Sequence, residues 1–463
     1  MKAIFRTFLV CILILTYKLH GQSTSDFKEK LSNYLSIQNK RLHFNGVVLI
    51  ANEDGILFQE AIGFASHELQ VPLTIDSKFK IASISKSFTG MLVAIAQKEG
   101  KLRLENTIDQ YFPDKALPNN WNKITIRHLV SHTSGIPHWD DYGDYWTVKS
   151  LLSLNQEQIL NDIFSMSLMF NPGGDVNYSS PAYFILATIL EKVYNDAYNN
   201  ILTNKILNPL GLKNTGVYND IEIIKNMSSG YSLLPSDSLI IAPYRHTSTL
   251  KGAGSLYSNA KDLLTWSKSV LNEPASKDVF SKTTNLPMHH NNNAAYGMGW
   301  YIHNNSNRSK AYQVAGGTLG YSSISVIYPE EKLYFVLLSN VSTFPINEIW
   351  SDIEKIIFNK PFQLPEITKE LNIPKEMMGN LVGTYMAENN MKLTVIPYQN
   401  QLFVKLGGSR PLEIVYGKGL VFHAKKINIK FTFKMSSDNK VEELIADGRG
   451  EVHHFKKISN NVE

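Results

Sequence analysis

Alternating hydrophobic and polar positions predict strands near the start of the chain, followed by a long helical stretch. Residues 46–66, GVVLIANEDGILFQEAIGFAS, predict a β-hairpin, because two apolar runs flank the turn-forming tetrapeptide Asn-Glu-Asp-Gly. Residues 83–100 are rich in Ala, Leu and Met and end in Glu-Gly, which predicts a helix with a glycine stop. Residues 104–190 alternate short helical patterns with clusters of turn residues. The first half of the chain is therefore expected to be mainly helical after its opening hairpin.

A second group of strands follows in the last third of the chain. Residues 314–328 and 333–340 read as two strands joined by the turn Pro-Glu-Glu-Lys, and residues 343–359 read as a helix that closes this unit. Three prolines then fall within residues 361–377, which indicates a linker. Residues 378–463 show short alternating strands separated by turns, the spacing of a small antiparallel barrel or sandwich.

Residues 1–21 have the pattern of a signal peptide. Lys2 and Arg6 precede the apolar run FLVCILILTY at 8–17, and the polar stretch KLHGQ follows it. This run is shorter than the roughly 20 residues that a membrane-spanning helix needs. The pattern predicts export to the periplasm or the medium and a mature form without an integral membrane segment. An uncleaved anchor is the alternative, because the cleavage site is imperfect.

Composition limits the class of protein and its partners. Hydrophobic residues make up 43% of the 463 positions and charged residues 19%, which excludes a solvated disordered chain. The formal charge of +5 falls to +2 without Lys2, Arg6 and Lys18 of the leader, so no nucleic-acid partner is expected. The single cysteine, Cys11, also lies in the leader, which excludes an internal disulfide and a Cys-based zinc site.

A candidate nucleophile opens the helix predicted at 83–100. Ser83 and Lys86 stand three residues apart, so both lie on one face of a helix and the lysine can reach the hydroxyl. A serine becomes a good nucleophile when a neighbouring base removes its proton, and a lysine with a lowered pKa can be that base. The pattern Ser-x-x-Lys occurs six times in the chain, and only this copy opens a long apolar helix after a strand-like stretch. Ser83 as an ordinary helix cap is the alternative interpretation.

Three histidines, His128, His132 and His138, flank the segment Ser-His-Thr-Ser-Gly. They lack the His-Glu-x-x-His spacing of a zinc helix, so the sequence predicts a structural loop that forms the floor of a cleft. No metal site and no cofactor are expected.

Residues 24–360 resemble the serine β-lactamase-like hydrolases, in the branch that contains class C β-lactamases, D-alanyl-D-alanine carboxypeptidases, D-aminopeptidases and related esterases. Six segments in the family's order carry the resemblance: FKIASISKSFT from position 79, IRHLVSHTSGIP from 126, PGGDVNYSSPAY from 172, GAGSLYSNAKDL from 252, YGMGW from 296 and AGGTLGYSS from 315. The C-terminal strands, opening with Gly-Thr-Tyr at 383–385, resemble the lipocalin-like domain appended to some members.

The resemblance implies an α+β fold of the β-lactamase/transpeptidase type. Such a fold has an antiparallel sheet flanked by helices and an all-helical subdomain, here followed by a small antiparallel β-barrel. The expected organisation is a signal peptide at 1–21, a hydrolase domain at 22–360, a linker at 361–377 and the lipocalin-like β-domain at 378–463.

The resemblance also implies an acyl-enzyme mechanism on a small-molecule or peptide substrate. Ser83 would attack a carbonyl carbon, and Lys86 with Tyr178 would handle the proton. A tyrosine acts as a base only if nearby cations hold its phenolate form. The N–H groups of Ser83 and Gly317 would form the oxyanion hole. Water would then hydrolyse the ester.

Two of the implied substrate-binding positions depart from the family. Ser180 stands where the family has Asn in its Tyr-x-Asn motif, and Val314 stands where it has Lys or His at the start of the third motif; Gly316 and Thr318 follow in that strand. Valine has no charge with which to hold a substrate carboxylate. The sequence therefore favours an exported esterase, amidase or peptidase with an uncharged substrate and weak β-lactamase activity. A degenerate member with a binding or regulatory role is the alternative.

Overall fold

The computed structural model describes residues 24–234, 238–270, 287–288, 291–303, 310–342, 345–365, 371–398, 400–407, 411–425, 429–438, 440–448 and 451–461. The expected signal peptide at 1–21 lies outside these residues. Within the described ranges, no helix combines the length and the hydropathy that crossing a membrane requires.

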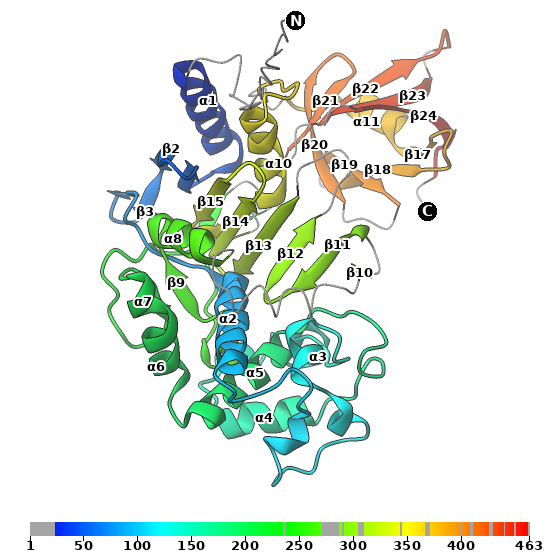
Figure 1. Ribbon diagram of the computed structural model, residues 1–463. Coiled ribbons are helices and arrows are strands. Elements are labelled where there is room, and N and C mark those ends of the chain that lie inside the picture. The colour runs from blue at the N-terminus through cyan, green and yellow to red at the C-terminus, as the bar shows by residue number, and fades with distance from the viewer. Residues whose placement is uncertain are drawn as a thin grey trace, which may run out of the picture.

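An eight-stranded antiparallel sheet forms the centre of the larger part of the molecule (Figure 1), in the spatial order β10-β11-β12-β13-β14-β15-β1-β2. The predicted hairpin at 46–66 is confirmed as the pair β1 and β2, at the end of this order. The strands are β1 (Gly46–Ala51), β2 (Ile56–Ile62), β10 (Pro287–Met288), β11 (Asn291–Gly297), β12 (Trp300–His303), β13 (Ala311–Thr318), β14 (Tyr321–Tyr328) and β15 (Leu333–Ser339).

The strand predicted over 314–328 is wrong in one respect, because the structure divides it into two. β13 and β14 pair as a tight hairpin in which Thr318 faces Tyr321 across the two-residue turn Leu319-Gly320. Gly320 has a φ of 86°, a conformation that glycine adopts at low cost. The run 314–328 has glycines and hydroxyl residues at several positions, so its pattern does not single out this turn. The turn predicted at Pro-Glu-Glu-Lys is confirmed between β14 and β15.

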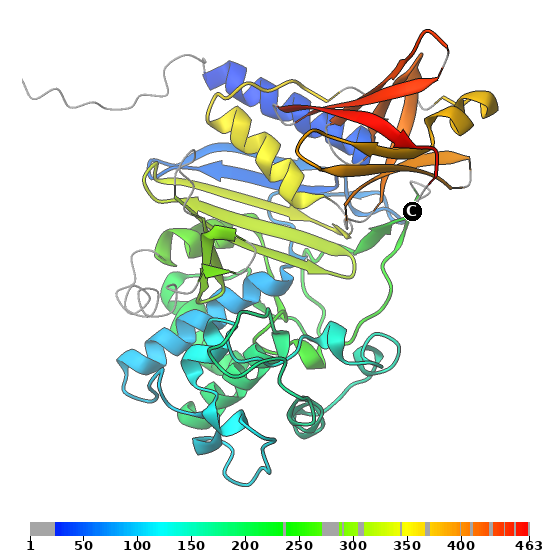
Figure 2. The same cartoon turned by 90° about the vertical axis from the view of Figure 1, so that its right-hand side faces the viewer.

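Helices cover both faces of the sheet. α1 (Thr24–Leu42) and α10 (Ile346–Ile357) pack together on one face, and α8 (Ala260–Val270) packs on the other (Figure 2). Every residue of β1 is buried, because its side chains alternate between the two faces. Val48 and Ile50 join the apolar cluster with α1 and α10, whereas Val47 and Leu49 join the larger cluster that includes α8.

The helical part lies beyond the face that carries α8 (Figure 1). Its central contact is between α2 (Ser85–Lys98) and α5 (Ser180–Tyr194), two helices with long buried segments. Its other helices are α3 (Ile126–Val130), α4 (Gln156–Phe164), α6 (Tyr198–Leu202) and α7 (Asn208–Leu210), with short helical turns η1 (Ala82–Ile84), η2 (Ile108–Gln110), η3 (Trp121–Lys123), η4 (Trp139–Asp141), η5 (Lys149–Leu151), η6 (Thr203–Leu207) and η7 (Ser248–Leu250).

The described part of the chain also has three small sheets besides the central sheet and the barrel. The first is β5-β9-β6, the second β16-β7-β8 and the third the pair β3-β4. Their strands are β3 (Phe64–Ser66), β4 (Val71–Pro72), β5 (Phe79–Lys80), β6 (Gly216–Val217), β7 (Tyr231–Leu233), β8 (Leu239–Ile241), β9 (Leu256–Ser258) and β16 (Val341–Ser342).

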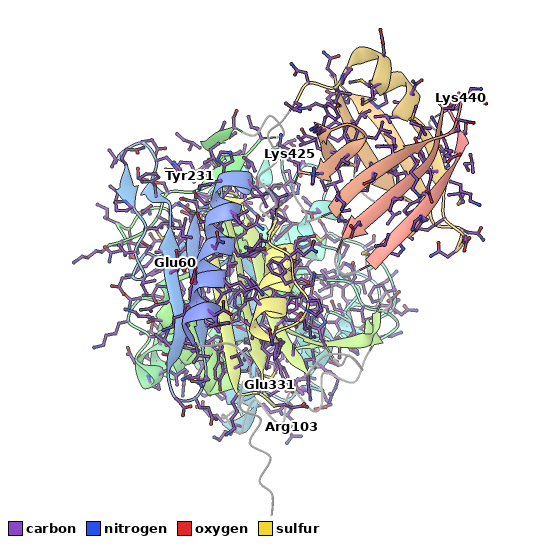
Figure 3. The ribbon with its side chains drawn as sticks, turned by 90° about the horizontal axis from the view of Figure 1, so that it is seen from above. Glu60, Arg103, Tyr231, Glu331, Lys425 and Lys440 are labelled. Atoms are coloured by element: carbon purple, nitrogen blue, oxygen red, sulfur yellow. The ribbon has the colours of Figure 1, made fainter. Side chains whose placement is uncertain are left out.

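The C-terminal strands close into an eight-stranded antiparallel barrel with its own apolar core, as the alternating pattern predicts. Figure 3 shows this barrel beside the larger part, with Lys440 near its outer end. Its elements are α11 (Lys375–Leu381), β17 (Gly383–Met386), β18 (Lys392–Tyr398), β19 (Gln401–Leu406), β20 (Leu412–Lys418), β21 (Val421–Ala424), β22 (Ile429–Met435), β23 (Val441–Gly448) and β24 (Glu451–Ser459).

Candidate active site

Ser83 lies in the helical turn η1, between β5 and α2, rather than in the first turn of the long helix itself. The backbone N–H of Ile81 donates to the carbonyl of Leu256 on β9 (2.9 Å), which fixes the entry into this turn. Ala82, next to Ser83, has a φ of 45°, a conformation that costs a residue with a Cβ of the order of 1 kcal/mol. The fold therefore holds the backbone beside Ser83 in a strained geometry, a feature that is common at reactive residues.

Lys86 lies one turn along the chain and points at Ser83. Its Nζ lies 3.2 Å from Ser83 Oγ, 3.1 Å from Ser180 Oγ and 2.9 Å from the carbonyl oxygen of Ala253. The side chain is buried, with 1% of its surface exposed. The described residues place no carboxylate within ion-pair distance of Nζ, so its polar partners are hydroxyl and carbonyl oxygens.

Other copies of the Ser-x-x-Lys pattern do not share this arrangement. Lys251 and Lys261, the lysines of two of them, pair with Glu191 and Asp76 at 2.6 Å and 3.0 Å. In these two copies the amine therefore has a carboxylate partner, which Lys86 lacks among the described residues. This difference supports Ser83 and Lys86 as the Ser-x-x-Lys copy that supplies the candidate nucleophile and its base.

Burial shifts the protonation of Lys86 toward the neutral amine. Removal from water lowers the pKa of Lys86 well below 10.5, and the positive charge of Arg245 lowers it further. A neutral amine has two N–H donors and one lone pair, which matches three polar neighbours. The lone pair is then available to accept the proton of Ser83.

Tyr178 lies over the same amine. Its ring centre is 4.7 Å from Lys86 Nζ. Burial raises the pKa of Tyr178 above 10, and a side-chain hydrogen bond with Ser83 opposes this effect only in part. The phenol is therefore protonated at neutral pH, which suits a hydroxyl that relays a proton better than a phenolate base.

Ser180, which replaces the family's Asn, is the first residue of α5. Ser179 caps this helix, because its Oγ accepts from the N–H of Ala182 at 3.2 Å, and Pro181 follows in the first turn. The hydroxyl of Ser180 reaches Lys86 at 3.1 Å. Serine is shorter than asparagine, and at this position it still makes one contact with the amine of Lys86.

The histidine loop predicted as a structural element holds the segment that carries Tyr178 and Ser180. His132 Nδ1 accepts from the N–H of Ser179 and His138 Nδ1 accepts from that of Ser180, both at 3.2 Å. Burial, with the charge of Lys86 as a smaller cause, lowers the pKa of His138 to about 4. Both rings act as neutral acceptors for this segment, which gives the loop a structural role.

β13 forms the wall opposite Lys86, and Gly316 is the point of closest approach. A Cβ on Gly316 would lie 2.1 Å from the carbonyl oxygen of Ile81 and 2.9 Å from the nitrogen of Ser83. The hydroxyl of Ser323 on β14 reaches the carbonyls of Ile81 (3.0 Å) and Gly316 (3.2 Å), which joins the nucleophile turn to the sheet.

The adjacent Gly317 is exposed and lies where one edge of β13 is unpaired among the described strands. β12 pairs with β13 only from Ala311 to Gln313 within the described strands, so the later part of β13 has no ladder partner on that side. A backbone N–H on this edge is available to a ligand. Val314, by contrast, is 2% exposed and packs in the larger apolar cluster.

The close approach at Gly316 leads to a prediction. Gly316→Ala is expected to lower kcat/KM for ester substrates at least 100-fold, because the new Cβ would push the turn η1 away from β13 and misplace the expected oxyanion donors. Loss of one such donor costs roughly 10²–10³ in rate. Ester hydrolysis and thermal unfolding are the measurements. Gly317→Ala is the matched variant: it keeps the N–H, and its Cβ would meet no atom within 4 Å, so its loss should be far smaller. Equal losses in the two variants would contradict the role of this contact.

Two groups at the site were not found by sequence reasoning. The first is the carbonyl of Ala253, which bonds Lys86; the segment from 252 carried the resemblance but gave no role for a backbone oxygen. The second is Arg245, whose charge acts on Lys86 although it belongs to none of the six segments. Only the folded chain brings them to Ser83.

A family model described as Beta-lactamase matches residues 31–349. The chain belongs to this family. The fold is of the β-lactamase/transpeptidase type, with a closed eight-stranded antiparallel barrel at the C-terminus, as the resemblance implied. Membership supports a serine hydrolase.

Relatives and solved structures agree with this assignment. Penicillin-binding protein 4* of Bacillus subtilis is 26% identical over 443 residues, covering 87% of this chain and 95% of the relative. The octameric penicillin-binding protein homologue from Pyrococcus abyssi has a TM-score of 0.66 at 21% identity and covers 92% of this chain and 99% of its own. D-amino acid amidase from Ochrobactrum anthropi, in complex with D-phenylalanine, has a TM-score of 0.61 at 21% identity and covers 71% and 99%. At these identities the solved structures show the fold alone.

Proposed function

We propose that this protein is an exported serine hydrolase that cleaves an ester or amide through an acyl-enzyme on Ser83. The observation that carries the proposal is the contact between Ser83 Oγ and a buried lysine amine, 3.2 Å apart, that has no carboxylate partner among the described residues. Nucleophile and base within hydrogen-bond reach are the signature of an activated serine. A degenerate site would not need to keep this amine buried.

Acylation begins as Ser83 Oγ attacks the substrate carbonyl carbon while its proton passes to Lys86 Nζ. The tetrahedral intermediate bears a negative oxygen, and the N–H groups of Ser83 and Gly317 donate to it. Its collapse breaks the bond to the leaving group, which takes up the proton from Lys86, relayed by the hydroxyl of Tyr178. The acyl group is then bound to Ser83 as an ester.

Deacylation repeats these steps with water. Water attacks the ester carbonyl and gives its proton to Lys86, the same donors hold the oxyanion, and Ser83 leaves with that proton. The reaction consumes one water and returns Ser83 and Lys86 to their starting forms. No metal or cofactor takes part in this scheme.

Covalent labelling tests the proposal. The protein without residues 1–21 is incubated with a fluorophosphonate or a labelled penicillin, and intact mass and peptide mapping locate the adduct. We expect stoichiometric fluorophosphonate labelling of the peptide that contains Ser83, slower labelling by the penicillin, and none in a Ser83→Ala control. Hydrolysis of 4-nitrophenyl esters with no adduct on Ser83 would refute the mechanism, and neither hydrolysis nor labelling would support a degenerate, non-catalytic member.

A further inference from the structure

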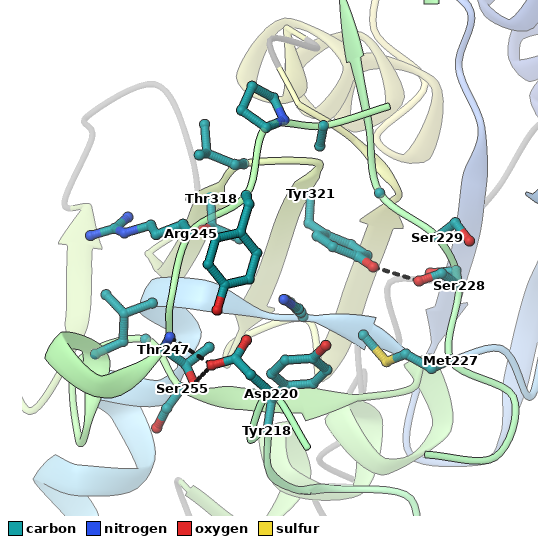
Figure 4. A pocket seen from close by; sticks show the side chains of 18 of the residues that line it. Tyr218, Asp220, Met227, Ser228, Ser229, Arg245, Thr247, Ser255, Thr318 and Tyr321 are labelled. Carbon is teal, nitrogen blue, oxygen red and sulfur yellow. Dashed lines mark hydrogen bonds between the residues drawn. The ribbon is translucent and has the colours of Figure 1, made fainter. Parts of the chain in front are cut away.

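A cavity of about 610 Å³ lies close to the turn η1 that carries Ser83. Thr318, the residue after Gly317, lines one side of it (Figure 4), and Gly254 lines another. A Cβ on Gly254 would lie 3.7 Å from the carbonyl carbon of Ala82, the neighbour of Ser83. The cavity therefore reaches the residue after Gly317 and lies close to the residue before Ser83, within reach of a substrate bound at Ser83.

Two cations line this cavity, and their surroundings differ. Lys80 Nζ lies 3.8 Å from the ring centre of Tyr218, and the charge of Asp220 acts on it. Arg245 lies at the side of the cavity away from Met227, as Figure 4 shows. Lys80 thus has a nearby carboxylate that offsets its charge.

Arg245 has only neutral partners among the described residues. Its guanidinium bonds the hydroxyl of Tyr145, and its central carbon lies 4.6 Å from the ring centre of Trp146. Its Nε is buried and has no hydrogen-bond partner in the described part of the chain. The carboxylate of Asp140 accepts from the indole N–H of Trp146 at 2.7 Å instead. An arginine that is held in place by two aromatic rings, with a buried donor left over, is prepared to bind an anion.

The position of Arg245 connects it with the reacting groups. It belongs to the segment that follows β8, and its partners Tyr145 and Trp146 belong to the helical part, so it joins the cavity wall to that part of the molecule. Its charge also reaches the amine of Lys86 and the ring of His138. β13 has the uncharged Val314 in its third motif, but a cation is present on another segment of the cavity wall.

We propose that Arg245 supplies the cation that β13 lacks and binds a carboxylate or a similar anionic group of the substrate. The inference rests on the proposed Ser83 hydrolase and changes the substrate class that Val314 alone suggests, from an uncharged to an anionic ester or amide. A guanidinium can hold a carboxylate through two parallel hydrogen bonds, which gives orientation as well as affinity. The anionic group lies either on the acyl part or on the leaving group, and two pairs of probes separate these cases.

Binding is measured first, without turnover, in the Ser83→Ala background. The acyl-side pair is the mono-4-nitrophenyl ester of glutaric acid against 4-nitrophenyl pentanoate, and the leaving-group pair is 4-carboxyphenyl pentanoate against phenyl pentanoate. Calorimetry is expected to show at least tenfold tighter binding of the anionic member in one pair. Adding Arg245→Gln should remove that preference, Arg245→Lys should keep part of it, and Arg103→Gln, a change at an exposed arginine, should keep all of it.

The same preference is then measured as a ratio of kcat/KM values in the protein with Ser83 intact. Arg245→Gln is expected to lower the ratio for the preferred anionic ester at least tenfold. It should also move the acidic limb of the pH profile to higher pH, since one charge that lowers the pKa of Lys86 is lost. If Arg245 had only a structural role, Arg245→Gln would lower kcat/KM equally for the anionic and the neutral ester of a pair.

Two results would overturn the inference. One is equal binding of the anionic and neutral members of both pairs in Ser83→Ala; the other is a preference that Arg245→Gln leaves unchanged. Because the binding measurement does not need Ser83, it gives an answer even if the hydrolase proposal fails. A missing adduct on Ser83 with an intact, Arg245-dependent preference would show that the hydrolase proposal alone is wrong.

Discussion

Ser83→Ala is expected to lower kcat/KM for a 4-nitrophenyl ester by about 10⁴-fold or more, the loss that follows removal of a nucleophile that acts as one unit with its base. The physical reason is that Ser83 Oγ lies 3.2 Å from the buried Lys86 Nζ and belongs to the strained turn η1. The measurement is steady-state ester hydrolysis with the protein lacking residues 1–21.

The matched control uses another Ser-x-x-Lys copy of the same chain. Ser77→Ala removes a hydroxyl that accepts from the N–H of Thr74 at 2.9 Å and that touches none of the catalytic groups. The kcat/KM of Ser77→Ala should stay within about threefold of the wild-type value. Its free energy of unfolding should fall by about 1 kcal/mol, the contribution of one hydrogen bond. Residual turnover by Ser83→Ala above a tenth of the wild-type rate would show that another group performs the chemistry.

Lys86→Met is expected to lower kcat/KM by about 10³-fold or more, because the variant loses the group that accepts the proton of Ser83 and later returns it. Methionine has a similar length and suits a buried site. The substitution removes the cost of burying an amine but leaves the carbonyl of Ala253 without its donor, so the free energy of unfolding should change by less than about 3 kcal/mol. Urea unfolding checks that the variant is folded, and a variant that keeps a tenth of the activity would exclude Lys86 as the base.

The pH profile of the wild type separates Lys86 from Tyr178 as the base. The reactive form of either base is the deprotonated one, so kcat/KM rises with pH through the pKa of that base and then levels off. Burial and Arg245 lower the pKa of Lys86 well below 10.5, whereas burial raises the pKa of Tyr178 above 10. We therefore expect the rise to end well below pH 10. Activity that still increases above pH 10 would favour the tyrosine.

Much of the architecture could be predicted from the order of hydrophobic and polar residues. The hairpin at 46–66 and the helix at 343–359 have periodic patterns with clear turns at their ends, and the structure has β1, β2 and α10 there. The barrel at the C-terminus was predicted because alternating strands with regular turns have few other ways to bury one face. The hairpin turn at Leu319-Gly320 was missed, since glycines and hydroxyl residues also occur within both flanking strands and do not single out the turn.

The sequence by itself determined the family, through six segments in a fixed order, and with them the candidate residues Ser83, Lys86 and Tyr178. It also determined that Val314 is uncharged, because that follows from identity and register alone. Local motifs carry such information because residues that are close in the sequence are also close in space, whatever fold the rest of the chain adopts.

Only the tertiary structure decided the electrostatics of the site. The carbonyl of Ala253, the histidines under α5 and the guanidinium of Arg245 come from segments far apart in the chain, and the burial that shifts the pKa of Lys86 is a property of all of them together. The absence of a cation at Val314 does not define the charge of the substrate, because a cation from another segment of the chain can lie near the same site. Charge at a site is a sum over everything that surrounds it, and that sum exists only in the folded chain.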